Sequence, residues 1–278
     1  MPRSSARLDS SAKEQVRDFW DEAACGEDLY LRGTAAEDYA AQAEQRYALE
    51  PYIADFARFE AAKDKDVLEI GVGLGADHQR FAAAGARLSG VDLTERAILH
   101  TRQRLALFGL ASDLRVGDAE RLPFDDDSFD LVYSWGVIHH SPETDAAARE
   151  ILRVLRPGGR FAVMIYHKRS LIGYMLWLRY ALLRGRPLTS LDEIYARHLE
   201  SPGTKAYSPD EARALFAGAA EVEVRTILTH GDLLEGKAGQ RHEGPLLSFA
   251  RRIWPRRLIR RLLPDHGLFL LIEGRKSR

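Results

Sequence analysis

The stretch Val67-Leu68-Glu69-Ile70-Gly71-Val72-Gly73-Leu74-Gly75 decides the fold of this chain. Its first four residues form a short apolar strand, its last five form a glycine-rich turn, and a helical pattern over residues 76–84 follows directly. Glycines let the backbone turn sharply and let a ligand approach without collisions with Cβ atoms. The first turn of the next helix leaves backbone N–H groups unpaired, and these attract a phosphate or a carboxylate. The stretch therefore predicts a strand–turn–helix unit that binds a ligand.

Strands and helices continue to alternate after this turn. Further strands are expected at residues 88–91, 114–116, 129–134, 161–165, 222–228 and 268–273, with helices at 95–108, 145–155 and 208–217 and a turn at 156–159. Strands that alternate with helices of this length build a parallel sheet with right-handed crossovers. We therefore predict an α/β fold, a doubly wound and mostly parallel seven-stranded sheet with helical lid insertions.

The sequence pattern also divides the chain into five parts. We expect a disordered tail at 1–13, an N-terminal helical lid at 14–59, the ligand-binding α/β core at 60–166, a helical insertion that caps the substrate at 167–207, and a C-terminal part at 208–278 that completes the sheet and carries a basic insertion.

Composition excludes several classes of protein. A net charge of −1 over 278 residues does not indicate a nucleic-acid-binding protein, and a single cysteine permits no intramolecular disulfide. The polar residues 1–13 lack the apolar segment of a signal peptide, and the apolar stretch 171–183 is too short to span a membrane. No group of His, Asp and Glu has the spacing of a metal site, so no metal is expected. These features predict a cytoplasmic protein.

Three carboxylates occur at or next to the ends of three consecutive strands: Glu69, Asp92 and Asp118. The carboxyl ends of parallel strands lie along one edge of the sheet, where open α/β folds bind ligands. Asp92 follows Gly71 by 21 residues, the spacing at which a carboxylate meets ribose hydroxyls. Asp118 precedes the small Ala119, so a polar group there can contact an adenine amino group while Ala119 leaves room for the ring. The pattern indicates a site for an adenosine-containing ligand.

These features and several further motifs resemble the class I S-adenosylmethionine-dependent methyltransferases, which have a Rossmann-like fold. The similarity covers about residues 60–166 and is greatest to the subgroup that includes quinone and small-molecule methyltransferases. A nicotinamide dehydrogenase fits less well, because the three turn glycines are evenly spaced. The matching runs are 68–75, 90–94, 117–124, 128–132, 139–140 and 153–159.

The resemblance implies that S-adenosylmethionine is the cofactor. It implies that Glu69 and the glycines hold the methionine portion, that Asp92 holds the ribose and that Asp118 and Ala119 hold the adenine. Aromatic residues of the lid, Phe19, Trp20 and Tyr39, are expected to close over the sulfonium, whose positive charge favours aromatic faces. The complete set of cofactor-binding candidates is Glu69, Gly71, Gly73, Gly75, Asp92, Leu93, Asp118, Ala119, Trp135 and Trp20.

Methyl transfer from a sulfonium is an in-line displacement, so the enzyme mainly aligns the acceptor with the methyl group and excludes water. A general base is needed only where the acceptor loses a proton. The candidates follow the fourth and fifth strands: His139 and His140, then Tyr166 and His167. An alternative is that the paired histidines serve loop architecture and cofactor packing, and that residues 166–169 are only a polar strand end.

The acceptor is indicated by two less regular segments. Residues 171–183 are apolar on more than one face, so this segment is either an ordinary packed helix, the roof of an acceptor pocket, a dimer interface or a bilayer contact. Residues 249–263 interleave six arginines with apolar side chains, which is typical of contact with a membrane surface or an acidic partner. A polar loop at 198–207 offers His198, Lys205 and Tyr207 as acceptor contacts.

Two functions remain open from the sequence. The first is methylation of a small, apolar or lipid-like acceptor by an enzyme in the cytoplasm or at the inner membrane surface, with no nucleic-acid partner. The second is a catalytically silent adaptor that keeps the fold and docks on a partner or membrane through the basic C-terminal segment. The oligomeric state and the atom that is methylated are not indicated by any motif.

Overall fold

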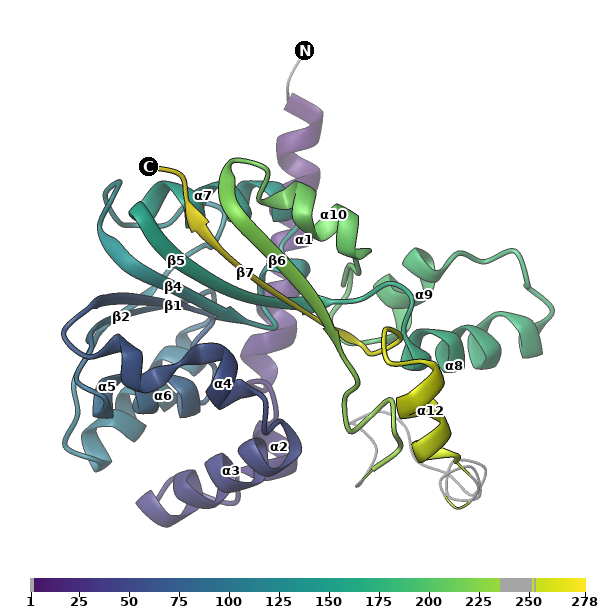
Figure 1. The fold of residues 1–278 in the computed structure, drawn as a ribbon, viewed down its shortest axis with the longest axis horizontal. Helices are drawn as coiled ribbons and strands as arrows, with labels where there is room; N and C mark the ends of the chain where they lie inside the picture. The colour runs from purple at the N-terminus through teal and green to yellow at the C-terminus, as the bar shows by residue number, and fades with distance from the viewer. Residues whose placement is uncertain (1–2, 236–251, 253) are drawn as a thin grey trace.

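Strand β1 (Asp66–Ile70) lies at the centre of a seven-stranded sheet with the order β3-β2-β1-β4-β5-β7-β6 (Figure 1). The computed structural model describes residues 3–235, 252 and 254–278, and for residues 3–11 only the helical path. Four of the five β1 residues are buried, as expected of a strand covered on both faces. The other strands are β2 (Arg87–Asp92), β3 (Asp113–Val116), β4 (Phe129–Trp135), β5 (Leu155–Tyr166), β6 (Ala219–Ile227) and β7 (Phe269–Lys276).

The strand pairing confirms the predicted fold class. All pairs among β1 to β5 are parallel, and β7 is antiparallel to both β5 and β6. The sheet order reverses at β1, where β2 and β4 lie on opposite sides. Such a reversal leaves a crevice beyond the carboxyl ends of the strands, and ligands bind there in open α/β sheets.

Helices cover both faces of the sheet. They are α1 (Arg3–Glu22), α2 (Glu27–Tyr30), α3 (Ala36–Leu49), α4 (Ile53–Ala57), η1 (Phe59–Ala62), α5 (Ala76–Ala83), α6 (Glu95–Leu107), η2 (Ile138–His140), α7 (Thr144–Val154), α8 (Leu171–Tyr180), η3 (Leu182–Arg184), α9 (Leu191–His198), α10 (Pro209–Leu215) and α12 (Arg256–Leu262). Helix α10 begins as the sequence predicts, with Ser208 accepting a hydrogen bond from Glu211 N and Pro209 in the first turn.

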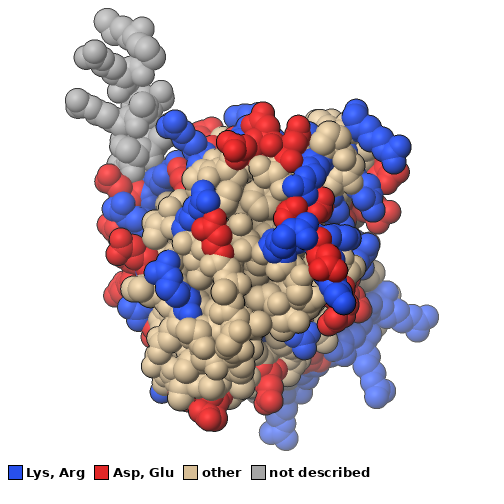
Figure 2. Space-filling model, turned by 90° about the vertical axis from the view of Figure 1, so that its left-hand side faces the viewer, with Lys and Arg blue, Asp and Glu red and all other residues tan. Residues whose placement is uncertain are grey.

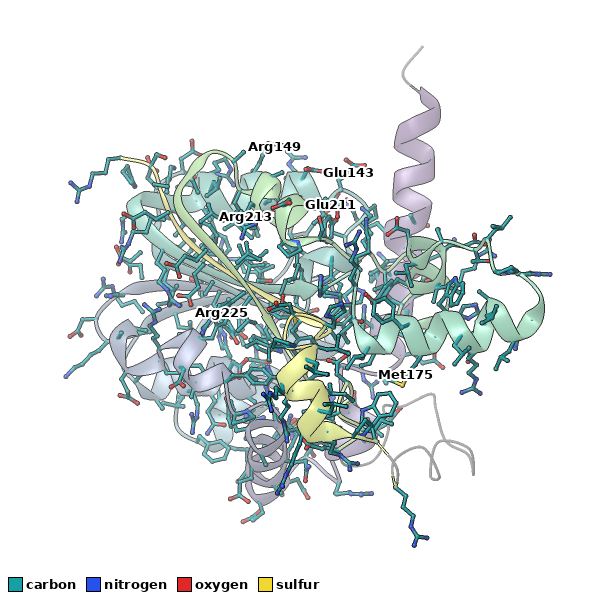
Figure 3. The ribbon with its side chains drawn as sticks, turned by 45° about the vertical axis from the view of Figure 1, so that its right-hand side comes forward. Glu143, Arg149, Met175, Glu211, Arg213 and Arg225 are labelled. Carbon is teal, nitrogen blue, oxygen red and sulfur yellow. The ribbon has the colours of Figure 1, made fainter. Side chains whose placement is uncertain are left out.

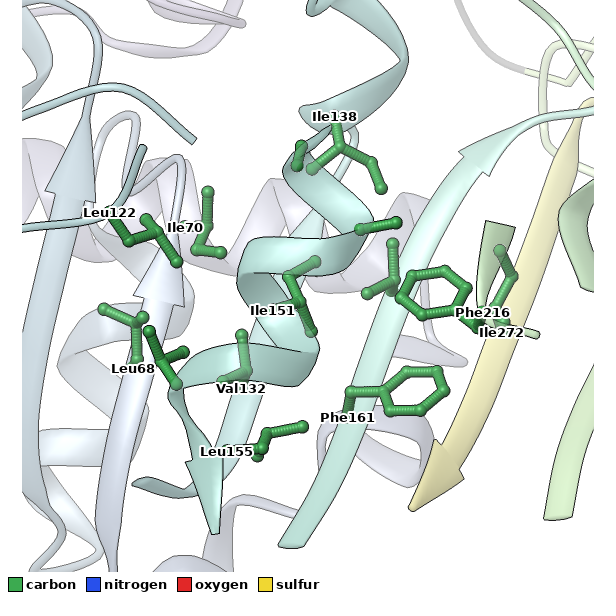
Figure 4. Close-up of a cluster of buried hydrophobic side chains, with 14 of the residues drawn as sticks. Leu68, Ile70, Leu122, Val132, Ile138, Ile151, Leu155, Phe161, Phe216 and Ile272 are labelled. Atoms are coloured by element: carbon green, nitrogen blue, oxygen red, sulfur yellow. The ribbon is translucent and has the colours of Figure 1, made fainter. Parts of the chain in front are cut away.

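The two faces of β1 explain the two hydrophobic cores. Leu68 and Ile70 point to the side covered by α7 and α10, where Ile151 and Phe216 pack against the sheet (Figure 4). Val67 points to the opposite side, which α4, η1 and α5 cover. Alternate side chains of a strand face opposite sides of the sheet, so one short apolar run serves both cores. This packing fixes the position of the glycine turn that follows β1.

Two segments differ from the local pattern that the sequence indicated. The structure gives residues 3–11 only as the helical path of α1, so the disordered tail expected at 1–13 stays a prediction. A helix that is nucleated further along propagates because each added residue gains one hydrogen bond. The expected turn at 156–159 lies inside β5 as an irregularity, since Leu155 pairs with Phe129 and Arg160 pairs with Leu131.

Helices α8, α9 and α12 project to one side of the molecule (Figure 1). The N-terminal part of α8 contacts α12 through Leu171 and Ile259, and α8 packs on α9 through Leu176 and Ile194. Part of the predicted basic insertion, residues 236–251 and 253, lies outside the described residues. No helix in the described ranges is long and apolar enough to cross a membrane.

Candidate active site

A cavity of about 1020 Å³ lies at the carboxyl ends of β1, β2, β4 and β5. The lid helices α1 and α3 form one wall, and α8 with the segments around Leu234 and Trp254 forms another. Sites for drug-sized ligands have volumes of about 300–1,000 Å³, so this cavity has room for more than one small molecule. All ten predicted cofactor residues line it: Glu69, Gly71, Gly73, Gly75, Asp92, Leu93, Asp118, Ala119, Trp135 and Trp20.

The glycine turn has one position open to the cavity and two that are packed. A Cβ atom on Gly71 would lie 2.1 Å from Val137 Cγ2, and one on Gly75 would lie 2.8 Å from Thr101 Oγ1. A Cβ on Gly73 would meet nothing within 4 Å. All three have positive φ angles, which glycine adopts without strain. Gly71 and Gly75 therefore let the protein pack, while Gly73 leaves space where a ligand can approach the backbone.

Asp92 connects the end of β2 to this turn. Its carboxylate accepts hydrogen bonds from the Gly73 N–H at 3.2 Å, from the Thr94 N–H at 3.0 Å and from the Thr94 hydroxyl at 2.9 Å. Burial raises the pKa of Asp92, although these hydrogen bonds oppose the effect. Asp92 thus orders the glycine turn as well as presenting a carboxylate to the cavity.

Glu69 takes part in a buried chain of hydrogen bonds. Its Oε2 lies 2.8 Å from His78 Nδ1, and His78 Nε2 lies 2.8 Å from the Ser112 hydroxyl, which donates to the Leu88 carbonyl. Burial raises the pKa of Glu69 and lowers that of His78 to about 3. Both shifts have the same cause, because burial disfavours the charged form of each group.

Lys13 of α1 contacts the third carboxylate of the rim. Its Nζ lies 2.5 Å from Asp118 Oδ2 and 2.5 Å from Glu120 Oε2. Burial of the Lys13 ammonium opposes its charge, but the two carboxylates raise its pKa. The lid is thereby joined to the expected adenine end of the cavity. Sequence reasoning missed this contact because the composition of residues 1–13 is that of a disordered tail.

An ion pair between the partly exposed Arg46 and the buried Asp77 supports the opposite wall. Arg46 of α3 makes two contacts with Asp77 of α5, Nε to Oδ1 at 3.2 Å and Nη2 to Oδ2 at 2.7 Å. The hydroxyls of Tyr47 and Tyr133 donate to the same carboxylate at 2.8 and 2.9 Å. Burial opposes ionisation of Asp77, but Arg46 and the two hydroxyls outweigh it and lower the pKa. No local sequence motif indicated this network.

The far end of the cavity holds a second polar group. Tyr166, at the end of β5, donates its hydroxyl to Glu200 Oε2 at 2.7 Å, and His140 Nε2 lies 3.3 Å from the same oxygen. His140 Nδ1 is held by the hydroxyls of Ser201 at 2.8 Å and Thr204 at 3.1 Å. Two predicted candidates, His140 and Tyr166, are therefore brought together by Glu200, a residue that the sequence did not single out.

Comparison with known proteins identifies a methyltransferase domain within this chain. A family model described as a methyltransferase domain matches residues 68–163, which include the glycine turn, Asp92 and Asp118. Residues 68–163 are a class I S-adenosylmethionine-dependent methyltransferase domain. The predicted family is confirmed, and S-adenosylmethionine is the cofactor that the residues of the cavity fit. The open position at Gly73 and the row of rim carboxylates are the observations on which this fit rests.

Individual relatives share the methyltransferase core. A demethylmenaquinone methyltransferase of Tropheryma whipplei is 32% identical over 151 residues, 53% of this chain and 62% of the relative. A phthiotriol/phenolphthiotriol dimycocerosates methyltransferase of Mycobacterium tuberculosis is 42% identical over 99 residues, 35% of this chain and 36% of the relative. An N-methyltransferase structure from Haemonchus contortus shares the fold, with a TM-score of 0.61 at 19% identity over 95% of this chain and 60% of that one. The chain therefore covers less than two thirds of each of these relatives.

Two predicted catalytic residues, His139 and His167, do not line the cavity. His139 is fully buried beside the Tyr166 ring, 4.1 Å between centroids, and burial lowers its pKa well below the ordinary range. His167 is also buried, and its Nδ1 bonds to the Gly267 carbonyl at 3.0 Å. The alternation of side chains along β5 explains the second case, because Tyr166 and His167 cannot face the same side.

One of the lid aromatics expected over the sulfonium and two of the expected acceptor contacts also lie outside the cavity. Tyr39 is buried against His100, at 2.9 Å from its Nδ1, and does not reach the cavity. His198 stacks on Tyr180, with ring centroids 4.0 Å apart. Lys205 donates to the carbonyl oxygens of Ser141 and Pro142 and so fixes a loop of the core. These side chains already make contacts that stabilise the fold.

The prediction that no metal is needed stays a prediction. Among the described residues, His139, His140 and Glu200 place potential ligand atoms within 4.8 Å of one another. The Glu200 carboxylate and His140 Nδ1 already have hydrogen-bond partners. Within the described part of the chain, both ring nitrogens of His139 and the Nε2 atom of His140 have no hydrogen-bond partner.

Proposed function

We propose that the protein methylates an apolar, lipid-like acceptor with S-adenosylmethionine as the methyl donor. The observation that carries this proposal is the uneven composition of the cavity. Its rim at β1, β2 and β3 is polar, whereas its other end is lined mainly by apolar and aromatic side chains. These are Ile172, Met175, Leu176, Leu178, Leu199, Leu234, Trp254, Leu268 and Phe269.

The acceptor end is built mainly by segments that lie outside the strand–helix units of the core. Met175, labelled in Figure 3, projects from α8 into this space. Trp254 is held in place because its Nε1 donates to the Asp232 carbonyl at 3.0 Å. An apolar acceptor gains from burial at about 25 cal/mol per Å² of apolar surface, so such walls select for apolar molecules.

The residues of the cavity would promote transfer mainly by alignment. The bound cofactor supplies an electrophilic methyl group on a sulfonium. The glycine turn and Asp92 fix one reactant, and the apolar walls fix the other, so that the two meet in line. Trp20 closes the space from α1 and packs edge-on against His140, 5.3 Å between ring centroids. In this proposal, His140 and Tyr166 would hold a proton of the acceptor through Glu200.

Contact with a membrane surface is part of this proposal. Leu178 and Leu183 line the cavity and are also 45% and 70% exposed, so the acceptor end opens where apolar side chains reach the surface. Leu188 nearby is 97% exposed. A lipid-like acceptor dissolved in a bilayer would enter through this opening. The basic segment adds attraction to anionic lipids, at about 1 kcal/mol per Arg near the surface.

The arginines of this region are gathered on α12, which carries Arg256, Arg257, Arg260 and Arg261. Figure 2 shows lysine and arginine side chains that project together beyond the lower right edge, where α12 lies. The face toward the viewer in Figure 2 mixes both charges in its upper part. Glu235 pairs with Arg260 at 2.7 Å, so one of these charges is balanced. Arg256 donates to the carbonyl oxygens of Leu233 and Leu234, and the exposed Arg257 and Arg261 suit an anionic surface.

A labelled-methyl screen tests the proposal. The full chain is incubated with methyl-labelled S-adenosylmethionine and a cell extract, and the products are partitioned between an organic and an aqueous phase. We expect label in the organic phase, and its loss with Asp92→Ala. Label confined to the aqueous phase would contradict an apolar acceptor, and no label in either phase would contradict the enzymatic function.

One observation favours the second candidate, a catalytically silent adaptor. Asp118 is already bound to Lys13, and Glu69 is already bound to His78, so two rim carboxylates have protein partners. An adaptor would retain these contacts and would show neither cofactor binding nor turnover. Calorimetry with S-adenosylmethionine separates the two candidates, since an adaptor gives no heat of binding.

A further inference from the structure

Two adjacent histidines and a glutamate come together beside Tyr166 at the far end of the cavity. The histidines are His139 and His140 of η2, and the glutamate is Glu200, which follows α9. One potential ligand atom from each residue lies within 4.8 Å of those of the other two. Consecutive residues of a 3₁₀ turn project about 120° apart. The two imidazole rings nevertheless lie with their centroids 4.2 Å apart, so the fold gathers three side chains that are common metal ligands.

The hydrogen bonds around His140 indicate which of its ring nitrogens carries a proton. The Thr204 hydroxyl donates its one proton to the Ser201 carbonyl at 2.7 Å. The oxygen of this hydroxyl lies 3.1 Å from His140 Nδ1, so it accepts a hydrogen bond from that nitrogen. The proton of a neutral His140 is therefore on Nδ1, and Nε2 presents a lone pair. Histidines that bind metals have this arrangement, because a hydrogen bond from one nitrogen orients the other.

The Nε2 atom of His140 faces an oxygen that is also an acceptor. It lies 3.3 Å from Glu200 Oε2, but the contact lacks the geometry of a hydrogen bond, and Nε2 has no hydrogen-bond partner within the described residues. Tyr166 donates to the same oxygen at 2.7 Å. Two acceptors at this distance repel each other unless a positive charge lies between them. A metal cation supplies that charge, since ligand atoms of tetrahedral zinc lie about 3.3 Å apart when the bonds are about 2.0–2.1 Å long.

His139 has two ring nitrogens whose hydrogen-bonding capacity is not used. Its side chain is fully buried, and neither nitrogen has a hydrogen-bond partner in the described ranges of the chain. Burial of a polar atom without a partner is costly, and such atoms in folded proteins commonly serve a ligand or an ion. Coordination of a cation by one of these nitrogens would lower that cost. It would also account for a histidine at a position that is otherwise part of the core.

Glu200 can act as a metal ligand and keep its other contacts. An ionised carboxylate has two oxygens with about four acceptor positions in all. The hydrogen bond from Tyr166 takes one of these positions and orients the carboxylate, as partners of metal ligands do. The Glu200 side chain is 32% exposed, and Glu200 and His140 both line the cavity. A cation therefore has a path to the three side chains through the cavity.

We propose that His139, His140 and Glu200 bind a divalent transition-metal cation, with Zn²⁺ as the best fit. Two imidazoles and one carboxylate suit zinc, whereas Mg²⁺ and Ca²⁺ prefer oxygen ligands. Three protein ligands leave one position of a tetrahedral site, and that position would open to the cavity, which two of the ligands line. Sequence spacing did not indicate this site, because Glu200 lies far along the chain from the histidines. The inference goes beyond the proposed function and does not depend on it.

Calorimetric titration of metal chlorides into the full chain, without an affinity tag, tests this site. The chain is first treated with a chelator and dialysed, and circular dichroism checks that it is folded. We expect one Zn²⁺ to bind per chain, at least about 100-fold more tightly than Mg²⁺. Co²⁺ serves as a spectroscopic probe and should give the visible absorption of a four-coordinate site with nitrogen ligands.

Two ligand variants, one positioning variant and one matched control locate the cation. His140→Gln and Glu200→Gln should each weaken Zn²⁺ binding by about 100-fold or more, because each removes one of three ligands. Tyr166→Phe keeps the ligands and removes the hydrogen bond that orients Glu200, so a loss of about 10-fold is expected. His198→Gln replaces a histidine that stacks on another ring, and it should leave Zn²⁺ binding unchanged.

The outcomes decide the inference independently of methyl transfer. A chain that binds no Zn²⁺, or that binds Mg²⁺ as tightly, would overturn it. Zn²⁺ binding that is unchanged in His140→Gln and Glu200→Gln would place the cation elsewhere and would also overturn it. If a variant does not fold, the Co²⁺ spectrum of the unmodified chain decides, since the spectrum of six-coordinate, hydrated cobalt would contradict the site. Binding of S-adenosylhomocysteine tests the proposed function separately, and its failure would leave these results unaffected.

Discussion

The Tyr166 hydroxyl donates a 2.7 Å hydrogen bond to Glu200, and this contact joins the end of β5 to the loop that follows α9. His140, at the end of η2, lies 3.3 Å from the same carboxylate oxygen. Three elements that are far apart in sequence therefore present one polar group at the apolar end of the cavity. The structure places this group beyond β4 and β5, the strands expected to face the reacting methyl group.

Stability depends on the pair of Arg46 and the buried Asp77. We expect Asp77→Asn to lower the free energy of unfolding by about 3–5 kcal/mol, because removal of one partner leaves a buried charge uncompensated. Tyr133→Phe removes only one hydrogen bond to Asp77 and should cost about 1 kcal/mol. Urea unfolding followed by circular dichroism measures both changes. Equal and small losses would show that the pair does not stabilise the fold.

Glu50 gives the folded state a defined pH dependence. Its pKa is about 7 in the folded protein, against 4.5 for the ordinary side chain, so the folded state binds more protons between these values. The free energy of unfolding should therefore fall as the pH rises through this window. Burial is the main cause of the raised pKa; the charge of Arg46 lowers it, and the charges of Asp77 and Glu200 raise it further.

Thermal unfolding at about pH 5 and about pH 8 checks the sign. The glutamine of Glu50→Gln cannot ionise. The melting temperature of this variant minus that of the unmodified chain should therefore be larger at about pH 8 than at about pH 5. Glu44→Gln provides the control and should follow the unmodified chain at both. A Glu50→Gln difference that is the same at both pH values would contradict the burial of this carboxylate.

Membrane contact should depend on the exposed leucines at the cavity opening. Leu183→Ser combined with Leu188→Ser removes two side chains that are 70% and 97% exposed, and we expect a loss of sedimentation with anionic vesicles of about 10-fold or more. Leu107→Ser, at a position 45% exposed on α6, is the control and should bind normally. Binding should also weaken at high salt. Salt-insensitive binding, or no binding by the unmodified chain, would contradict membrane contact through exposed leucines and arginines.

The fold could be predicted from the sequence because its determinants are local. The apolar run of β1, the glycines that follow it and the Ser208 cap each act within a few residues, and each lies where the sequence predicts. The row Glu69, Asp92 and Asp118 was also predictable, since strand ends of a parallel sheet lie along one edge. Their participation in cofactor binding stays a prediction until a ligand is measured.

The remaining contacts of the site could not be predicted because they join distant segments. Lys13 and Asp118 are 105 residues apart, and Tyr166 and Glu200 are 34 apart, with no repeating pattern to relate them. The choice between His139 and His140 depends on how η2 turns after β4, which places the first histidine in the core and the second at the cavity. Sequence spacing gives no measure of that rotation.

Calorimetric titration of S-adenosylhomocysteine into paired glycine variants tests the central claim most directly. Gly73 and Gly109 both have positive φ angles and open space where a Cβ atom would lie, but only Gly73 of the two lines the cavity. The account predicts binding by the unmodified chain, similar affinity for Gly109→Ala, and a loss of about 10-fold or more for Gly73→Ala through a clash with the ligand. Equal affinity of the two variants, or no binding by the unmodified chain, would contradict a cofactor site at the glycine turn.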